Sequence, residues 1–387
     1  MKRKFNDTGL CMPHRHYMAD TSAKIEQIIQ LVEGGEYFAI NRPRQFGKTT
    51  TLSLLSRQLS LRDNYLVLSI SFEDIDTDTY QHQERFIYGF LDMLVIEFES
   101  LDLPEPAGFI EQHIDQVSDM LTLSRFITRL VRDVLPDKSL VLLIDEVDKS
   151  SNNQLFLDFL GMLRKKYLRR NEGKDFTFQS VILAGVHDVK TLKAKIRPDD
   201  ERKYNSPWNI AADFNVDLSF SPPEIESMLR DYSRENGIQP DVAAIAEQLY
   251  YYTSGYPYLV SKLCKFIDED IVPLRDDKNW SVADTEAAFK MIADKGYTTT
   301  LFDSLTKNLE NNEDLYELVF QIIINGKSFD FAIANPVISQ GFILGVIVKS
   351  DQGRCQIHNR IFEQRIYDYM MSKLQINLKS QIPISSD

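Results

Sequence analysis

Apolar and polar residues alternate with two different periods in the first half of the chain. From Ser22 to Val32 the apolar residues return every three or four positions, which predicts an amphipathic helix that ends at Gly34-Gly35. Shorter apolar runs predict buried strands at 37–40, 65–70, 140–145, 180–186 and 215–220. Helices are expected between them at 50–59, 80–100, 123–135 and 153–170. Strands that alternate with helices indicate an α/β domain with a parallel, doubly wound sheet.

The pattern changes after residue 221, where two prolines follow one another. Apolar positions at helical spacing then predict helical segments at 224–294, 314–324 and 328–340. Two apolar runs on either side of Ser350-Asp351-Gln352-Gly353 predict a β-hairpin, and a final helix is expected from about residue 360. This order suggests a winged-helix module at the end of the chain. We therefore expect three domains: an α/β domain at 1–221, a helical lid at 222–300 and a winged helix at 301–387.

The run from Asn41 to Thr50 carries the strongest chemical signal. It ends in Gly47-Lys48-Thr49, follows an apolar strand and leads into a helix, which is the setting of a phosphate-binding loop. Backbone N–H groups of such a loop point at phosphate oxygens. The lysine can reach the β- and γ-phosphates, and the threonine hydroxyl can bind Mg²⁺. Because arginine at position 42 replaces the first glycine of the usual pattern, the prediction needs a second motif.

The second motif lies at the end of the predicted strand 140–145. Four apolar residues lead there into Asp145 and Glu146, and ligands of open α/β sheets bind at the carboxyl ends of the strands. Asp145 can hold Mg²⁺, and Glu146 can take a proton from the attacking water. The two motifs together predict a site for Mg-ATP. The alternative is two unrelated loops, one beside a core strand and one an acidic helix cap.

Composition and charge argue against several classes of protein. The 387 residues carry a formal net charge of −13, which argues against a dedicated nucleic-acid coat. Three widely spaced cysteines give neither a disulfide framework nor a zinc site, so we expect a reducing, cytoplasmic setting. No apolar run has transmembrane length, so no membrane partner is expected. The basic run Arg164–Arg170 either meets nucleic acid or complements the dipole of its own helix.

These motifs resemble those of bacterial AAA-like ATPases, close to the STAND branch of P-loop ATPases. The resemblance extends over nearly the whole chain. It implies a P-loop sheet of the additional-strand, catalytic-glutamate type, followed by a lid and a winged helix. Four segments carry it: His16–Asp20, Arg42–Thr49, Lys203–Ile210 and Ser254–Val260.

The same resemblance implies ATP or ADP with Mg²⁺ as cofactors and assigns further contacts. The nucleotide-binding set is Tyr17 and Met18 on the adenine side, Arg42, Arg44, Gly47, Lys48, Thr49 and Thr50 in the loop, Pro257 near the lid, and His358 in the wing. His358 would sense the phosphate of ADP. The alternative is a histidine that packs in the core or caps the last helix.

Two features after the fourth strand could complete the site. His187 could orient the water or contact phosphate, or it could be a loop histidine without a ligand. Arg197 could act on a neighbouring molecule. Arg202 has carboxylates on the same loop and is expected to pair there.

The predicted metal ligands are Thr49 and Asp145, and the predicted catalytic group is Glu146 with Lys48 and His187.

The sequence thus predicts an ATP-binding, ATP-hydrolysing intracellular switch protein. A role in signalling or defence rests on the resemblance alone. Its partner would be another protein or a second copy of the chain. One alternative is a winged-helix protein whose ATP site regulates nucleic-acid binding, but 329–336 carries almost no basic residue. Another is an interaction scaffold that holds nucleotide without hydrolysing it.

Overall fold

The computed structural model describes residues 2–73, 75–76, 78–150, 153–186, 208 and 210–380. The chain forms two compact units. The sheet unit comprises Ser22–Arg42 and Lys48–Asp217, and the helical unit comprises Met1–Thr21, Pro43–Gly47 and Leu218–Asp387. The phosphate loop is therefore divided between them. Its tip, residues 43–47, belongs to the helical unit, and both of its ends belong to the sheet unit.

Four of the five predicted strands form a parallel sheet in the described part of the sheet unit. The strands are β1 (Phe38–Asn41), β2 (Tyr65–Ser71), β3 (Ser139–Asp145) and β4 (Ser180–Gly185). Their order in the sheet is β1-β4-β3-β2, so β4 separates the strand before the phosphate loop from the strand that ends in Asp145. The carboxyl ends of β1 and β3 therefore open onto the same edge of the sheet.

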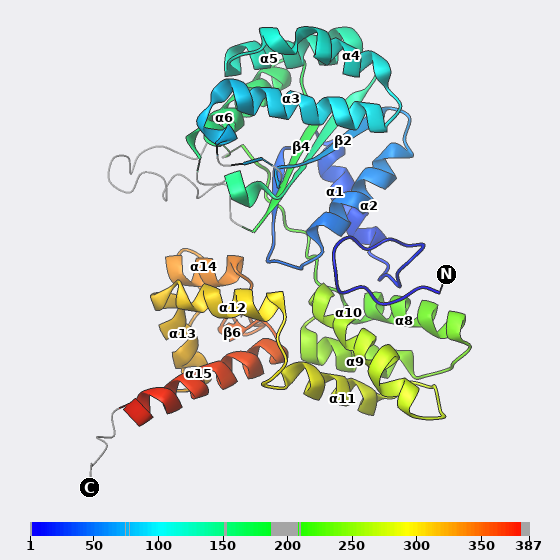
Figure 1. Cartoon of the computed structure of the whole chain (residues 1–387), viewed down its shortest axis with the longest axis vertical. Coiled ribbons are helices and arrows are strands. Elements are labelled where there is room, and N and C mark those ends of the chain that lie inside the picture. Colours follow the sequence, from blue (N-terminus) through cyan, green and yellow to red (C-terminus); the bar gives the residue numbers. More distant parts are fainter. Residues whose placement is uncertain are drawn as a thin grey trace. The chain divides into compact units, whose positions relative to one another are not determined.

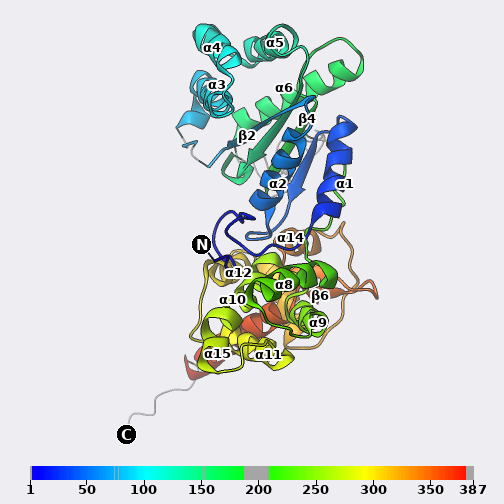
Figure 2. The same cartoon turned by 90° about the vertical axis from the view of Figure 1, so that its right-hand side faces the viewer.

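Helices cover both faces of this sheet. They are α1 (Ser22–Glu33), α2 (Lys48–Ser60), α3 (Gln83–Ser100), α4 (Pro104–His113), α5 (Met120–Arg129) and α6 (Gln154–Asn171). Side chains on one face, such as Ile70 and Leu142, join α3, α5 and α6 in an apolar core. Val67 and Leu143 on the other face are also buried, as expected for a covered parallel sheet. Figures 1 and 2 show α1 and α2 on the opposite side of the sheet from α3 and α4.

The predicted fifth strand at 215–220 is wrong. In the described part of this region the only pairing with β1 is one parallel bridge between Phe38 and Ala212. The segment is held by side chains instead of by a ladder. The Arg42 guanidinium donates to the Val216 carbonyl at 2.7 Å, and the Phe214 ring stacks on Phe38 with centroids 5.7 Å apart.

Two members of the basic run on α6 support the fold. Lys166 is fully buried, and its ammonium lies 3.1 Å from the Asp175 carboxylate and 2.7 Å from the Thr128 hydroxyl. Burial lowers the pKa of Lys166, although Asp175 opposes that effect. Arg170 donates to the carbonyl oxygens of Gly35 and Phe178. These two cations are therefore committed within the sheet unit, which weakens the nucleic-acid interpretation of the run.

In the helical unit the predicted segment 224–294 is divided into shorter helices, and Thr300–Glu310 forms a helix that was not predicted. The helices and strands of the described part of this unit follow in chain order. They are α8 (Pro222–Asn236), α9 (Val242–Thr253), α10 (Pro257–Phe266), α11 (Val282–Ala293), α12 (Thr300–Glu310), α13 (Glu313–Ile323), α14 (Pro336–Ile343), β5 (Ile347–Lys349), β6 (Cys355–Ile357) and α15 (Arg360–Ser380). The strands β5 and β6 form the expected antiparallel hairpin. None of the described helices is both long enough and apolar enough to cross a bilayer.

Candidate functional site

The start of α2 places Lys48 and Thr49 at the carboxyl edge of the sheet. Lys48 is 8% exposed, and its ammonium donates to the Arg42 carbonyl at 3.0 Å. The Thr49 hydroxyl donates to Oδ2 of Asp145 at 2.6 Å. The structure therefore brings the two sequence motifs together, although 96 residues separate this threonine from this aspartate.

Glu146 follows Asp145 in an unusual backbone conformation. Its φ is 55°, in the left-handed region that residues other than glycine rarely adopt. The Glu146 N–H donates to Oδ1 of Asp145 at 2.9 Å, which supports this conformation. Burial and the Asp145 carboxylate raise the pKa of Glu146, and Lys48 partly opposes them. A strained backbone and a perturbed carboxyl at one position are typical of a functional site.

Asp148 joins this edge to the end of β4, a contact that the sequence reasoning missed. Its carboxylate accepts the Val186 N–H through both oxygens, at 2.8 and 2.7 Å. The approach is so close that a Cβ at Gly185 would lie 2.9 Å from Oδ1 of Asp148. An acidic residue two positions after Glu146 was the available signal. Val186 is the last described residue of this segment, so His187, Arg197 and Arg202 lie outside the described residues.

The tip of the phosphate loop is anchored by contacts within its own unit. The Tyr256 hydroxyl donates to the Arg44 carbonyl. Phe46 is 3% exposed, with its ring 4.8 Å from that of Tyr256 and 5.8 Å from that of His358. Gln45 donates to the Thr300 hydroxyl at 3.2 Å. The backbone of the loop tip is therefore held, while the Arg44 side chain stays exposed.

In the segment Ser254–Pro257, three residues each make a contact that explains why that residue type is present. Gly255 has φ +72°, and a Cβ there would lie 2.0 Å from the Phe220 carbonyl oxygen, so only glycine fits. Tyr256 holds Arg44, as described above. Pro257 begins α10 and is the nearest side chain to a Cβ placed on Gly47, at 3.9 Å. This motif thus packs directly against the loop tip.

Tyr17 lies in an aromatic cluster of the helical unit. Its side chain is 2% exposed, and its ring centroid is 5.0 Å from that of Phe5 and 5.2 Å from that of Tyr232. Its hydroxyl accepts a hydrogen bond from Asn236 at 3.3 Å. The ring is therefore enclosed by other rings. Met18, the next residue, is only half-buried.

His358 is 8% exposed and packs inside the helical unit. Its Nδ1 lies 2.9 Å from the Gly345 carbonyl oxygen, and its backbone N–H donates to Val346 at 3.0 Å. The ring also lies 5.4 Å from that of Tyr256. A contact between His358 and phosphate stays a prediction.

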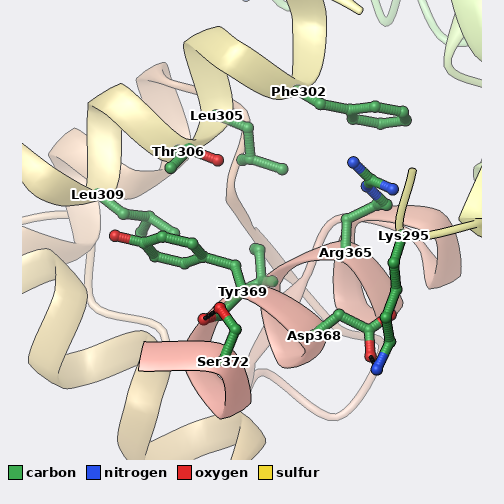
Figure 3. A pocket seen from close by; sticks show the side chains of 10 residues that line it. Lys295, Phe302, Leu305, Thr306, Leu309, Arg365, Asp368, Tyr369 and Ser372 are labelled. Atoms are coloured by element: carbon green, nitrogen blue, oxygen red, sulfur yellow. Dashed lines mark hydrogen bonds and ion pairs between the residues drawn. The ribbon is translucent and has the colours of Figure 1, made fainter. Parts of the chain in front are cut away.

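A pocket of about 260 Å³ lies between α12 and α15 (Figure 3). The charged side chains around it already have partners. Arg365 donates to the carbonyls of Asp294 and Tyr297, and the Lys295 ammonium lies 3.3 Å from the Asp368 carboxylate. Because these groups are paired, the pocket offers a ligand little recognition, and the phosphate loop is the better candidate site.

Comparison with known proteins places this geometry in a family. Residues 10–364 match the family described as the AAA-like domain. An uncharacterized WD repeat-containing protein of Synechocystis is 20% identical over 375 residues, which cover 91% of this chain and 29% of that protein. The chain thus spans less than a third of the length of that relative.

Two solved structures resemble the chain at low sequence identity. A Walker-type ATPase of Pyrococcus abyssi has a TM-score of 0.58 and 12% identity, over 94% of this chain and 99% of that one. The ORC2 protein of Aeropyrum pernix has a TM-score of 0.48 and 12% identity, over 96% and 98% of the two chains. The similarity to the Pyrococcus abyssi ATPase shows a common fold.

Proposed function

The chain belongs to the AAA-like domain family, and we propose that it binds Mg-ATP and hydrolyses it to ADP and phosphate. The observation that carries this proposal is the 2.6 Å contact between Thr49 and Asp145 beside the buried Lys48. A hydroxyl and a carboxylate at this spacing are the protein groups that hold Mg²⁺ in P-loop enzymes. Strand β4 between β1 and β3 supports the additional-strand type of sheet.

Each proposed residue has a defined task. Lys48 would leave the Arg42 carbonyl and bind the β- and γ-phosphates. Thr49 and Asp145 would hold Mg²⁺, which would neutralise charge on the phosphates when bound. Among the described residues no group of three or more His, Cys, Asp and Glu is placed to hold a metal. Most of the other Mg²⁺ ligands would therefore be phosphate oxygens and water.

The remaining contacts in the proposal come from the loop and the adenine side. Further phosphate contacts are assigned to Gly47, Thr50, Arg42 and Arg44. Because the Tyr17 ring is enclosed, adenine would meet the backbone of this segment and Met18. The N-terminal segment is fixed to α10, since Ser261 donates to the Asn6 carbonyl at 2.6 Å. Pro257 begins that same helix.

Hydrolysis would be catalysed by Glu146, which would accept a proton from the attacking water. His187, which follows β4 in the sequence, is proposed to orient the water or to contact phosphate. In the proposed switch, exchange of ATP for ADP repositions the lid and the winged helix. We also propose that the chain is related to the STAND branch and that His358 contacts ADP. Its partner in this proposal is another protein or a second copy of the chain.

Metal removal offers the most direct test of the Mg²⁺ assignment. Excess EDTA should abolish ATP turnover and weaken ATP binding, because phosphate charge would then be neutralised by Lys48 and the loop alone. Added Mg²⁺ should restore both. The measurements are phosphate release and calorimetric titration with ATP. Full turnover in EDTA, with magnesium-free ATP, would contradict the proposal.

A further inference from the structure

The two ends of the phosphate loop and its tip belong to different units, and the tip has its own anchors. Tyr256 holds the carbonyl of Arg44. Pro43 is buried against the turn before β5, where a Cβ on Gly345 would lie 2.3 Å from Cγ of Pro43. That turn is fixed in its own place, because the Gly345 carbonyl contacts Nδ1 of His358 at 2.9 Å. The hold is therefore built from two separate elements of the helical unit.

We propose that Tyr256 and the Gly345 turn are positioning elements of the phosphate loop, and that their hold on residues 43–47 sets the affinity for nucleotide. This inference rests on the proposed function, because it assigns control of that same site. Neither element needs to touch the nucleotide. Each would act through the backbone of the loop tip.

Preorganisation is the physical basis of this control. Loop N–H groups bind phosphate only when the backbone is already curved, and a free loop loses entropy when it binds. The loop carries positive φ at Gln45 (57°), which residues other than glycine rarely adopt, and at Gly47 (79°), where glycine allows many other conformations. The curved form is therefore not favoured by the loop itself and depends on contacts from outside it. The loop tip is fixed by a buried ring, Phe46, and by the hydroxyl of a fully buried tyrosine, Tyr256. Loss of these contacts would leave the curved form less populated before ATP arrives.

Replacement of Tyr256 by phenylalanine tests the hydroxyl alone. Trypsin cuts after Arg44, and the acceptor of the Tyr256 hydroxyl is the carbonyl of that same peptide bond. We expect Tyr256→Phe to speed tryptic cleavage after Arg44 in nucleotide-free protein about tenfold, because cleavage requires local opening. The affinity for ATP should fall by a similar factor, which corresponds to about 1.4 kcal/mol. Turnover at saturating ATP should stay near wild type, because Glu146 is unchanged.

Tyr37→Phe is the matched control. Tyr37 is also fully buried, and its hydroxyl also donates to a backbone carbonyl, that of Phe178 at 3.1 Å. It should lower thermal stability about as much as Tyr256→Phe and leave cleavage after Arg44 and ATP affinity unchanged. Wild-type cleavage and ATP affinity in Tyr256→Phe would overturn the inference. If wild-type protein failed to bind ATP, the proposed function would fall, while the cleavage rates would still decide whether Tyr256 holds the loop.

The contact of Pro43 with the Gly345 turn gives an independent test. Alanine at Gly345 must move Pro43, and it must also adopt φ +71°. Gly353 has φ +76° and nothing within 4 Å of a Cβ, so Gly353→Ala has the same backbone cost without the clash. We expect Gly345→Ala, and not Gly353→Ala, to speed cleavage after Arg44 and to weaken ATP binding at least tenfold. Equal behaviour of the two variants would show that the turn does not hold the loop.

Discussion

Glu146→Gln is expected to bind Mg-ATP like wild type and to hydrolyse it about 10²–10⁴ times more slowly. The amide keeps the size and the hydrogen-bonding reach of the side chain. It cannot accept the proton of the attacking water. The backbone should be preserved, because its left-handed φ of 55° depends on the Glu146 N–H and on Oδ1 of Asp145. The substitution therefore separates chemistry from binding.

The measurement is a pair of assays on the same preparation. Calorimetry gives the ATP affinity, and phosphate release under single-turnover conditions gives the chemical step. Glu73→Gln is the matched control, because Glu73 follows β2 at the same edge of the sheet and also raises the pKa of Glu146. It should keep near wild-type turnover. Full turnover in Glu146→Gln, with hydrolysis measurable in wild type, would remove Glu146 from the catalytic role.

The parallel sheet could be predicted because its strands are buried on both faces. Runs such as Val141–Ile144 are apolar at every position, and no other element of that length needs this pattern. The sheet also brings Thr49 to Asp145, since carboxyl ends of parallel strands share one edge. The meeting of Thr49 and Asp145 therefore follows from local sequence and general sheet geometry.

The mistaken fifth strand shows that a pattern of apolar residues does not reveal the backbone hydrogen-bond partners. Val216 and Leu218 are buried, as in a strand. The Val216 carbonyl, however, accepts from the Arg42 side chain, and this donor takes the place of a ladder hydrogen bond. Period-two burial reports which side chains face inward. It does not report which group satisfies the backbone.

The anchors of the loop tip could not be predicted for a different reason. Tyr256 and Arg44 are 212 residues apart, and neither has a spacing or a charge that indicates the other. Gly345 has its effect through the space that it leaves for Pro43, which is visible only once the turn and the loop are folded. The sequence could name the groups that we propose to bind phosphate. The elements that hold the loop depend on tertiary packing alone.

Lys48→Ala is expected to weaken ATP binding by about one to two orders of magnitude. A hydrogen bond to a charged group contributes about 1.5–3 kcal/mol, and the lysine would make such bonds to two phosphates. The substitution also removes the 3.0 Å contact of Lys48 with the Arg42 carbonyl. A thermal unfolding measurement must therefore accompany the titration, so that a general loss of folding is recognised.

Lys165→Ala supplies the matched control for charge. Lys165 is an exposed lysine on α6 in the same sheet unit, so its loss changes the net charge equally without touching the loop. Calorimetric titration with Mg-ATP should show wild-type affinity for Lys165→Ala and greatly reduced affinity for Lys48→Ala. If a folded Lys48→Ala variant kept the wild-type affinity for ATP, the phosphates would have to bind away from Lys48. In that case neither the hydrolysis assigned to Glu146 nor the control of affinity by Tyr256 could stand in its present form.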